Sequence, residues 1–173
     1  IEELTKVDKK AHTVFDVGDE ALILAEIADT FVAKDKKLAL EIIDQKYDYD
    51  YVIVDDGLQN PTFSKKKSIL IFDGEYGLGN NFIFPAGPLR EKLDYAIKRV
   101  NFAVIIGQDK MFLEDYILSY GKDVIRAEMI AEDIKNKASK YIAFAGIGRP
   151  DKFYNTLEKN NFNVVEKISF SDH

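Results

Sequence analysis

The stretch "YVIVDDGLQN" at residues 51–60 joins a continuous run of apolar residues to two adjacent carboxylates and a glycine. Three similar apolar runs follow it, "SILIF" (68–72), "FAVII" (102–106) and "YIAFA" (141–145). Continuous rather than alternating apolar runs are typical of strands that are covered on both faces, as in a parallel sheet. We therefore expect four such strands, the first of them at residues 51–54.

Segments of helical period lie between and around these runs. Apolar residues recur at spacings of three and four in residues 19–31, 35–44, 89–100, 111–120 and 151–160. Pro88 and Pro150 stand where two of these helices would begin, and proline is tolerated there because its missing N–H has no helical partner. Strands that alternate with helices indicate an α/β fold with a mostly parallel sheet flanked by helices.

A polar, charge-mixed stretch precedes the last predicted strand. Residues 121–140 read "GKDVIRAEMIAEDIKNKASK", and a mixed polar composition between periodic segments is typical of a connection. We therefore expect one domain over residues 1–120, a linker over 121–140, and the start of a smaller α/β domain over 141–173.

The overall composition excludes several classes of protein. Lysine and arginine number 24 against 30 aspartates and glutamates, a net charge of −6, which argues against a nucleic-acid partner bound through a global basic field. The absence of cysteine excludes a disulfide framework and a cysteine-based metal site. The longest apolar runs, of about five residues, are far shorter than the roughly 18 needed to span a bilayer.

Two adjacent acids end the first predicted strand. In open parallel sheets ligands bind beyond the carboxyl ends of the strands, where Asp55 and Asp56 would lie. Carboxylates fixed in this way can present oxygen ligands to Mg²⁺ in phosphoryl-transfer enzymes. Two unit charges about 4 Å apart repel by roughly 4 kcal/mol at an effective dielectric of 20, so the pair calls for a cation, a basic neighbour or full solvation. From this motif alone, a solvated turn is an equal alternative.

Two further motifs carry charged residues at predicted helix starts. Asp19 opens the first predicted helix, where a carboxylate can cap free amides or, alternatively, take a proton from a substrate hydroxyl. In "PAGPLRE" (85–91), Arg90 and Glu91 fall in the predicted first turn of another helix. The helix dipole disfavours a cation there, so we expect Arg90 to face an anionic ligand or a carboxylate.

Taken together and in order, five motifs resemble the tetraacyldisaccharide 4'-kinase family. They are "VGDEALILA", "VIVDDGLQN", "DGEYGLGNNFIFPAGPLRE", "AFAGIGRPDKFYNTL" and "FSDH". The resemblance implies a P-loop-type α/β kinase domain followed by a smaller α/β domain, with ATP and Mg²⁺ between them. It also implies transfer of the γ-phosphoryl group to the 4'-hydroxyl of a tetraacyldisaccharide 1-phosphate. The enzyme would be peripheral, at the cytoplasmic face of the inner membrane of a Gram-negative bacterium.

The resemblance assigns roles to several charged residues of these motifs. Asp19 matches the family's catalytic base, and His173 in "FSDH" matches the histidine that pairs with it. Asp55 and Asp56 match the acids associated with Mg²⁺ and the nucleotide phosphates. Glu91 matches an acid near the metal.

Arg90 travels with the same motif and is expected to contact phosphate or substrate. Three positions depart from the family pattern: Asn60 replaces the usual histidine, Ala21 replaces a proline, and no "GxxxxGK[ST]" loop occurs in the sequence. We therefore expect a central portion of the kinase that is inactive by itself. The alternative is a non-catalytic α/β module that binds an anionic ligand through "PAGPLRE" and "GIGRP".

Overall fold

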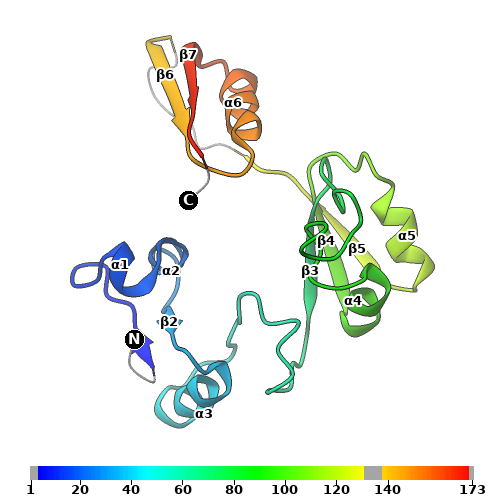
Figure 1. The fold of residues 1–173 in the computed structure, drawn as a ribbon. Coiled ribbons are helices and arrows are strands. Elements are labelled where there is room, and N and C mark those ends of the chain that lie inside the picture. Colours follow the sequence, from blue (N-terminus) through cyan, green and yellow to red (C-terminus); the bar gives the residue numbers. More distant parts are fainter. Residues whose placement is uncertain (1–3, 131–137, 172–173) are drawn as a thin grey trace.

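The computed structural model describes residues 4–130 and 138–171 and shows an α/β fold (Figure 1). Its strands are β1 (Thr5–Lys6), β2 (Phe31–Val32), β3 (Ile69–Asp73), β4 (Phe102–Ile106), β5 (Asp123–Ala127), β6 (Lys140–Ala145) and β7 (Asn163–Ser169). Its helices are α1 (Val14–Val17), α2 (Asp19–Leu24), α3 (Lys36–Lys46), α4 (Leu93–Arg99), α5 (Leu113–Ser119) and α6 (Pro150–Lys159).

The largest sheet has the order β3-β4-β5, and both of its strand pairs are parallel. A helix lies in each crossover, α4 between β3 and β4 and α5 between β4 and β5, as parallel connections require. The helices and one face of the sheet share a hydrophobic core made of Phe72, Ile97, Ala103, Ile105, Leu113 and Ile117. Burying each large aliphatic side chain of this kind contributes roughly 1.5–3 kcal/mol.

The opposite face of this sheet is open over the described residues. Ile69, Ile71 and Ile125 point to that face and are 48%, 66% and 50% exposed. The predicted runs at 68–72, 102–106 and 141–145 do form strands β3, β4 and β6. The structure nevertheless covers β3–β5 with helices on one face, where the sequence pattern predicted cover on both.

The predicted strand at residues 51–54 is wrong. The segment has no strand structure, and Tyr51 and Ile53 are 85% and 94% exposed. A strand requires a neighbour to accept and donate its ladder hydrogen bonds. Within residues 4–130 and 138–171, no backbone group pairs with this segment. It lies instead in the irregular connection between α3 and β3 (Figure 1).

The predicted linker is also wrong over residues 123–127, which form β5 and pair in register with β4. The stretch looks polar because β5 is an edge strand, and charged side chains are common on edges. Arg126 of β5 pairs with Glu114 of α5 at 2.9 Å, while Val124 packs against the hydrophobic core.

The helix predicted from about Pro88 begins later, at Leu93. Residues 82–89 form a compact loop in which Phe84 N–H donates to Leu89 O (2.8 Å) and Leu89 N–H donates to Phe82 O (3.2 Å). These bonds use backbone groups that a helix would need, so Arg90 and Glu91 precede α4 and do not lie in its first turn. Pro150, by contrast, is the first residue of α6, as predicted.

The chain's last unit is a parallel β6–β7 pair with α6 packed against it. Tyr154 of α6 is 3% exposed and shares a small core with Ala143 and Ala145 of β6. Its hydroxyl donates to Ile168 O of β7 at 2.6 Å, which satisfies its buried polar end. None of the helices in the described parts of the chain has the length and hydrophobicity to cross a membrane.

Candidate functional site

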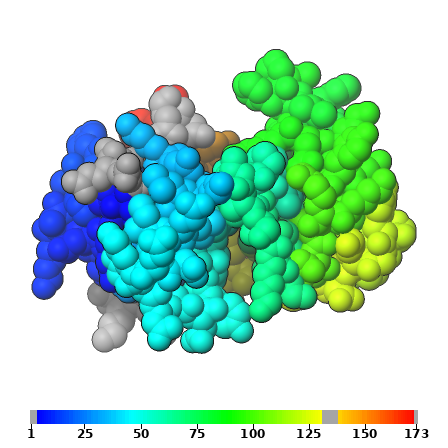
Figure 2. All heavy atoms as spheres, turned by 90° about the horizontal axis from the view of Figure 1, so that it is seen from below, coloured from blue at the N-terminus to red at the C-terminus, as the bar shows by residue number. Residues whose placement is uncertain are grey.

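The loop that carries the adjacent acids is held by a lysine of α3. Lys36 Nζ donates to the backbone carbonyl of Asp55 at 2.6 Å and approaches that of Asp56 at 3.4 Å. Asp56 has a positive φ of 54°, which turns the chain sharply before Gly57. Figures 1 and 2 show this part of the chain between α3 and the β3–β5 unit. The lysine therefore anchors the backbone and leaves both carboxylates directed elsewhere.

Asp56 forms an ion pair with Arg90. The distance from Arg90 Nη2 to Asp56 Oδ2 is 2.6 Å, and the two side chains are 60% and 59% exposed. The contact joins "DDGLQN" to "PAGPLRE" across 34 positions of sequence. It confirms that Arg90 faces a carboxylate, and it supplies the basic neighbour that the two adjacent acids require. An exposed pair of this kind stabilises the fold by about 1 kcal/mol or less.

Glu91 is joined to the same loop by a second set of contacts. Gln59 Nε2 donates to Glu91 Oε1 at 2.8 Å, and Arg99 Nη2 of α4 forms an ion pair with the same oxygen. The sequence predictions did not include Gln59 or Arg99. Gln59 follows the acidic pair by three residues and could have been suspected from its place in "DDGLQN". Arg99 carries no such signal.

The Asp55 carboxylate has no hydrogen-bond or ion-pair partner among the described residues. Carboxylate oxygens are the donors that Mg²⁺ prefers, and Mg²⁺ in nucleotide sites uses one or two of them beside phosphates and water. Asp55 and Asp56 fit that donor chemistry. No group of three or more potential metal ligands comes together within residues 4–130 and 138–171, so Glu91 does not complete a protein cage with them.

Asp19 lies apart from these contacts. It is the first residue of α2, directly after Gly18, whose φ of 86° ends α1. Its Oδ1 accepts the N–H of Glu20 at 3.0 Å, and the side chain is exposed. In Figures 1 and 2, α2 lies on the opposite side of the molecule from the β3–β5 unit. His173 falls outside the described residues, so its pairing with Asp19 stays a prediction.

The end of β3 and the start of α6 are joined by an acid and two bases. Asp73 Oδ2 accepts from Arg149 Nη1 and from Lys152 Nζ, both at 2.8 Å, and Arg149 also lies over the Tyr76 ring. Partial burial alone would raise the pKa of Asp73, but hydrogen bonds from Lys152 and from backbone amides more than offset it. The pKa of Asp73 therefore lies below its ordinary value. This contact brings "DGEYGLGN" and "GIGRP" together.

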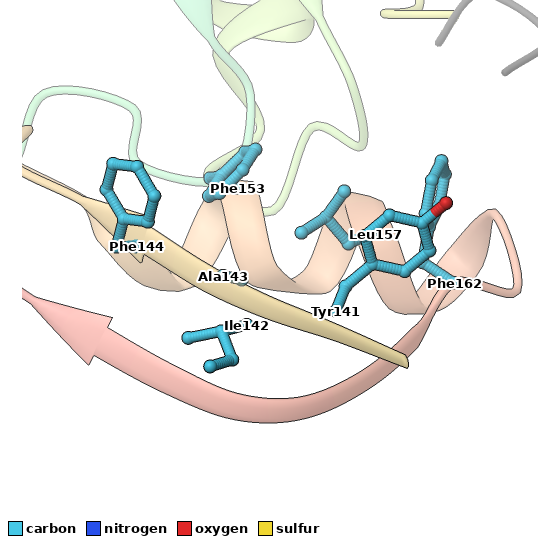
Figure 3. Close-up of a pocket in the computed structure, with 7 residues that line it drawn as sticks. All are labelled: Tyr141, Ile142, Ala143, Phe144, Phe153, Leu157 and Phe162. Carbon is cyan, nitrogen blue, oxygen red and sulfur yellow. The ribbon is translucent and has the colours of Figure 1, made fainter. Parts of the chain in front are cut away.

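Two surface pockets of the described part of the chain contain none of the predicted site residues. One, of about 240 Å³, lies between β6 and α6 and is lined by apolar side chains, among them Phe144, Phe153 and Phe162 (Figure 3). Another, of about 330 Å³, lies against α3 and includes Tyr47, Tyr49 and other residues. Asp55, Asp56 and Arg90 lie on exposed loop segments, and Asp19 is exposed at the start of α2.

Comparison with known proteins gives consistent matches over almost the whole chain. Residues 2–173 match the family model of tetraacyldisaccharide-1-P 4'-kinase. A tetraacyldisaccharide 4'-kinase of Rhodospirillum centenum is 36% identical over 174 residues, covering 97% of this chain and 50% of the relative. One of Methylorubrum extorquens is 39% identical over 172 residues, covering 96% of this chain and 52% of the relative. The chain thus spans about half the length of the curated relatives it matches.

A solved structure shares the fold. The crystal structure of the "apo" form of LpxK from Aquifex aeolicus in complex with ATP matches with a TM-score of 0.73 at 23% sequence identity. The match covers 98% of this chain and 57% of that one. Together with the family model and with relatives well above 30% identity, these matches show that the chain belongs to the tetraacyldisaccharide-1-P 4'-kinase family.

Proposed function

We propose that the chain is the part of a tetraacyldisaccharide 4'-kinase that presents the acidic loop and the "PLRE" segment to ATP. The reaction transfers the γ-phosphoryl group of ATP to the 4'-hydroxyl of a tetraacyldisaccharide 1-phosphate. The observation that carries this proposal is the pairing of Asp56 with Arg90 and of Gln59 with Glu91. It unites two motifs that the family resemblance assigns to one nucleotide site.

Asp55 is the side chain best suited to hold Mg²⁺, because its carboxylate has no partner among the described residues. Asp56 pairs with Arg90 through one carboxylate oxygen, and its other oxygen has no partner among the described residues. When bound, Mg²⁺ neutralises charge on the nucleotide phosphates and so favours phosphoryl transfer. The role of the chain is to hold two carboxylates at fixed positions, which Lys36 supports by fixing the loop backbone.

Asp19 is proposed to take the proton of the sugar hydroxyl, with His173 as its partner. Its exposed position at the start of α2 leaves it open to a substrate. Arg90, which pairs with Asp56, is proposed to contact phosphate or substrate as well. Positioning and charge neutralisation then provide most of the rate acceleration, and the base adds to it.

The substrate determines where the enzyme works. A tetraacylated disaccharide is held in a bilayer by its acyl chains, so the kinase must meet it at the membrane surface. We propose that the whole enzyme is a peripheral protein of the cytoplasmic face of the inner membrane.

The test is transfer of labelled phosphate from ATP to a tetraacyldisaccharide acceptor by the full-length kinase. We expect Asp19→Asn to lower kcat by about 10²- to 10⁴-fold, the range of a lost general base. Glu20→Gln is the matched control, because it removes the adjacent exposed acid of α2 and should leave the rate unchanged. The proposal fails if the wild-type enzyme makes no magnesium-dependent product, or if Asp19→Asn is as active as the control.

A further inference from the structure

We infer that Arg99 is a positioning residue that holds Glu91 against the acidic loop and aims one of its carboxylate oxygens at the nucleotide site. The inference rests on the proposed function, which gives Glu91 its place near the metal. Arg99 belongs to α4, and neither the sequence motifs nor the family resemblance assigned it a role. The contacts of its guanidinium group with three separate acceptors carry the inference.

The Arg99 side chain is held along its own helix and reaches two other segments. Its Nε donates to the carbonyl of Tyr95 at 3.3 Å, one turn earlier in α4, so the side chain is held along its own helix. Its Nη1 approaches Leu58 O of the acidic loop at 3.4 Å, and its Nη2 pairs with Glu91. A planar guanidinium with several donors can serve these acceptors at once, and a lysine ammonium cannot match that geometry. Arg99 therefore joins α4, "PLRE" and "DDGLQN".

The Glu91 carboxylate is held through one of its two oxygens. Both of its partners among the described residues, Gln59 Nε2 and Arg99 Nη2, contact the same oxygen, Oε1. Among the described residues, Oε2 has no hydrogen-bond partner. A carboxylate held through one oxygen has its rotation restricted and its other oxygen free for a ligand. Partners that orient a metal-facing group in this way usually matter almost as much as the group itself.

The Arg99–Glu91 ion pair is less exposed than the neighbouring Arg90–Asp56 ion pair. The Glu91 side chain is 21% exposed and that of Arg99 is 46% exposed, whereas Asp56 and Arg90 are both near 60%. A carboxylate that has lost most of its water depends more on a paired cation than an exposed one does. Loss of Arg99 would leave Glu91 with one neutral partner, Gln59. We therefore assign to Arg99 the stronger of the two links between the motifs.

The experiment compares Arg99→Gln and Arg99→Lys with Arg126→Gln in the full-length kinase. Arg126 is a matched control, since it pairs with Glu114 on the β5–α5 side of the sheet, with similar exposure. The first readout, which does not depend on activity, is hydrogen–deuterium exchange of the amides of residues 57–60 without nucleotide. We expect Arg99→Gln to accelerate their exchange, Arg99→Lys to accelerate it less, and Arg126→Gln to leave it unchanged.

The second readout is the Mg²⁺ concentration needed for half-maximal ATP binding, measured by calorimetry. We expect Arg99→Gln to raise it by about 10- to 100-fold, the usual effect of losing a partner that orients a metal ligand. Because Arg99 acts through Glu91, Arg99→Gln should not raise this Mg²⁺ concentration further in a protein that already carries Glu91→Gln. Thermal melting of each variant checks folding, and if Arg99→Gln does not fold, Arg99→Lys decides on the same two readouts.

Two results would overturn the inference. One is exchange at residues 57–60 that responds no more to Arg99→Gln than to Arg126→Gln. The other is a shift in the Mg²⁺ requirement that persists undiminished in the Glu91→Gln background. Failure of the proposed function is distinguishable, because an enzyme without phosphoryl transfer would still report on Arg99 through exchange and through ATP binding.

Discussion

Two regions of the molecule of similar length differ in how well they are packed. The packed region, residues 68–127, surrounds a core of six buried residues in which Ile97, Ile105 and Ile117 are completely inaccessible. The open region, residues 4–66, has a cluster of only three, Val7, Val17 and Ala21. Of the four acids predicted to act in catalysis or metal binding, Asp19, Asp55 and Asp56 lie in the open region, and Glu91 lies in the packed region.

The difference shows how the acidic loop obtains its position. The loop is not fixed by a core of its own, since residues 51–53 before it are exposed and residues 51–54 form no ladder within the described chain. It is held by side chains that reach from elsewhere: Lys36 from α3, Arg90 ahead of α4, and Arg99 from α4. The packed region thus supports the acidic loop, because the polar contacts of Arg90 and Arg99 hold the loop in a fixed position.

The largest expected effect is on the two cores themselves. Ile105→Ala should lower the free energy of unfolding by about 2–5 kcal/mol, because it leaves a cavity among fully buried neighbours. Val17→Ala, at a site 8% exposed in the smaller cluster, should lower it by about 1–2 kcal/mol. Urea unfolding of both variants measures the difference. Equal losses would mean that the two regions are packed equally well in solution.

A smaller effect is expected from two aspartates that accept free amide groups at the start of helices. In the packed region Asp109 accepts the N–H groups of Leu113 (3.0 Å) and Glu114 (2.9 Å) at the start of α5. In the open region Asp35 accepts those of Lys37 (2.8 Å) and Leu38 (3.1 Å) at the start of α3. The Asp109 side chain is only 4% exposed, whereas Asp35 is exposed.

The buried Asp109 carboxylate shields the two amides that it accepts from water. Asp109→Ala should therefore lower the free energy of unfolding by about 2 kcal/mol, at the upper end of the range for helix caps. Asp35→Ala should lower it by about 0.5–1 kcal/mol. Thermal unfolding of the two variants gives the comparison. The corresponding asparagine variants are the controls, since asparagine can still cap a helix. A larger loss at Asp35 than at Asp109 would contradict the contrast between the regions.

The smallest effect concerns the contact between the packed region and α6. The pKa of Asp73 is lowered, so its carboxylate adds stability that is present above its unfolded pKa, near 3.8, and is lost as the pH falls through the folded value. Asp73→Asn should therefore cost roughly 1 kcal/mol at pH 7, since its partners are partly exposed. The difference between wild type and variant should shrink toward zero as the pH falls below the unfolded pKa, near 3.8, and through the lower folded pKa. A pH-independent difference would show that the ion pairs do not hold these units together.

The sequence predicted the parts of the fold in which apolar runs found partners. The strands β3, β4 and β6 and the proline-initiated helix α6 follow directly from local pattern. The same pattern failed at residues 51–54, because an apolar run shows a capacity for burial but does not supply a neighbouring strand. At β5 the pattern failed to predict a strand that is present, because the charged residues of this edge strand look like those of a polar connection.

The candidate site was predicted residue by residue, and its internal contacts were not. The expectation that Arg90 faces an anion or a carboxylate followed from its place near a predicted helix start, although α4 begins three residues later, at Leu93. The identity of its partner, Asp56, could not be predicted, because it depends on how two loops 34 positions apart meet. For the same reason nothing local indicated the contacts of Gln59 and Arg99 with Glu91.

The left-handed backbone at Asp56 restricts which amino acids this position can accept during evolution. A φ of 54° is readily adopted by glycine, asparagine and aspartate, and is strained for branched side chains. A saturation library at position 56 should therefore yield folded proteins enriched in these three residues before any selection for activity. Of the three, only aspartate carries a charge. A later selection for activity should therefore retain aspartate alone if the reaction needs the carboxylate, and all three residues if the position needs only the left-handed backbone.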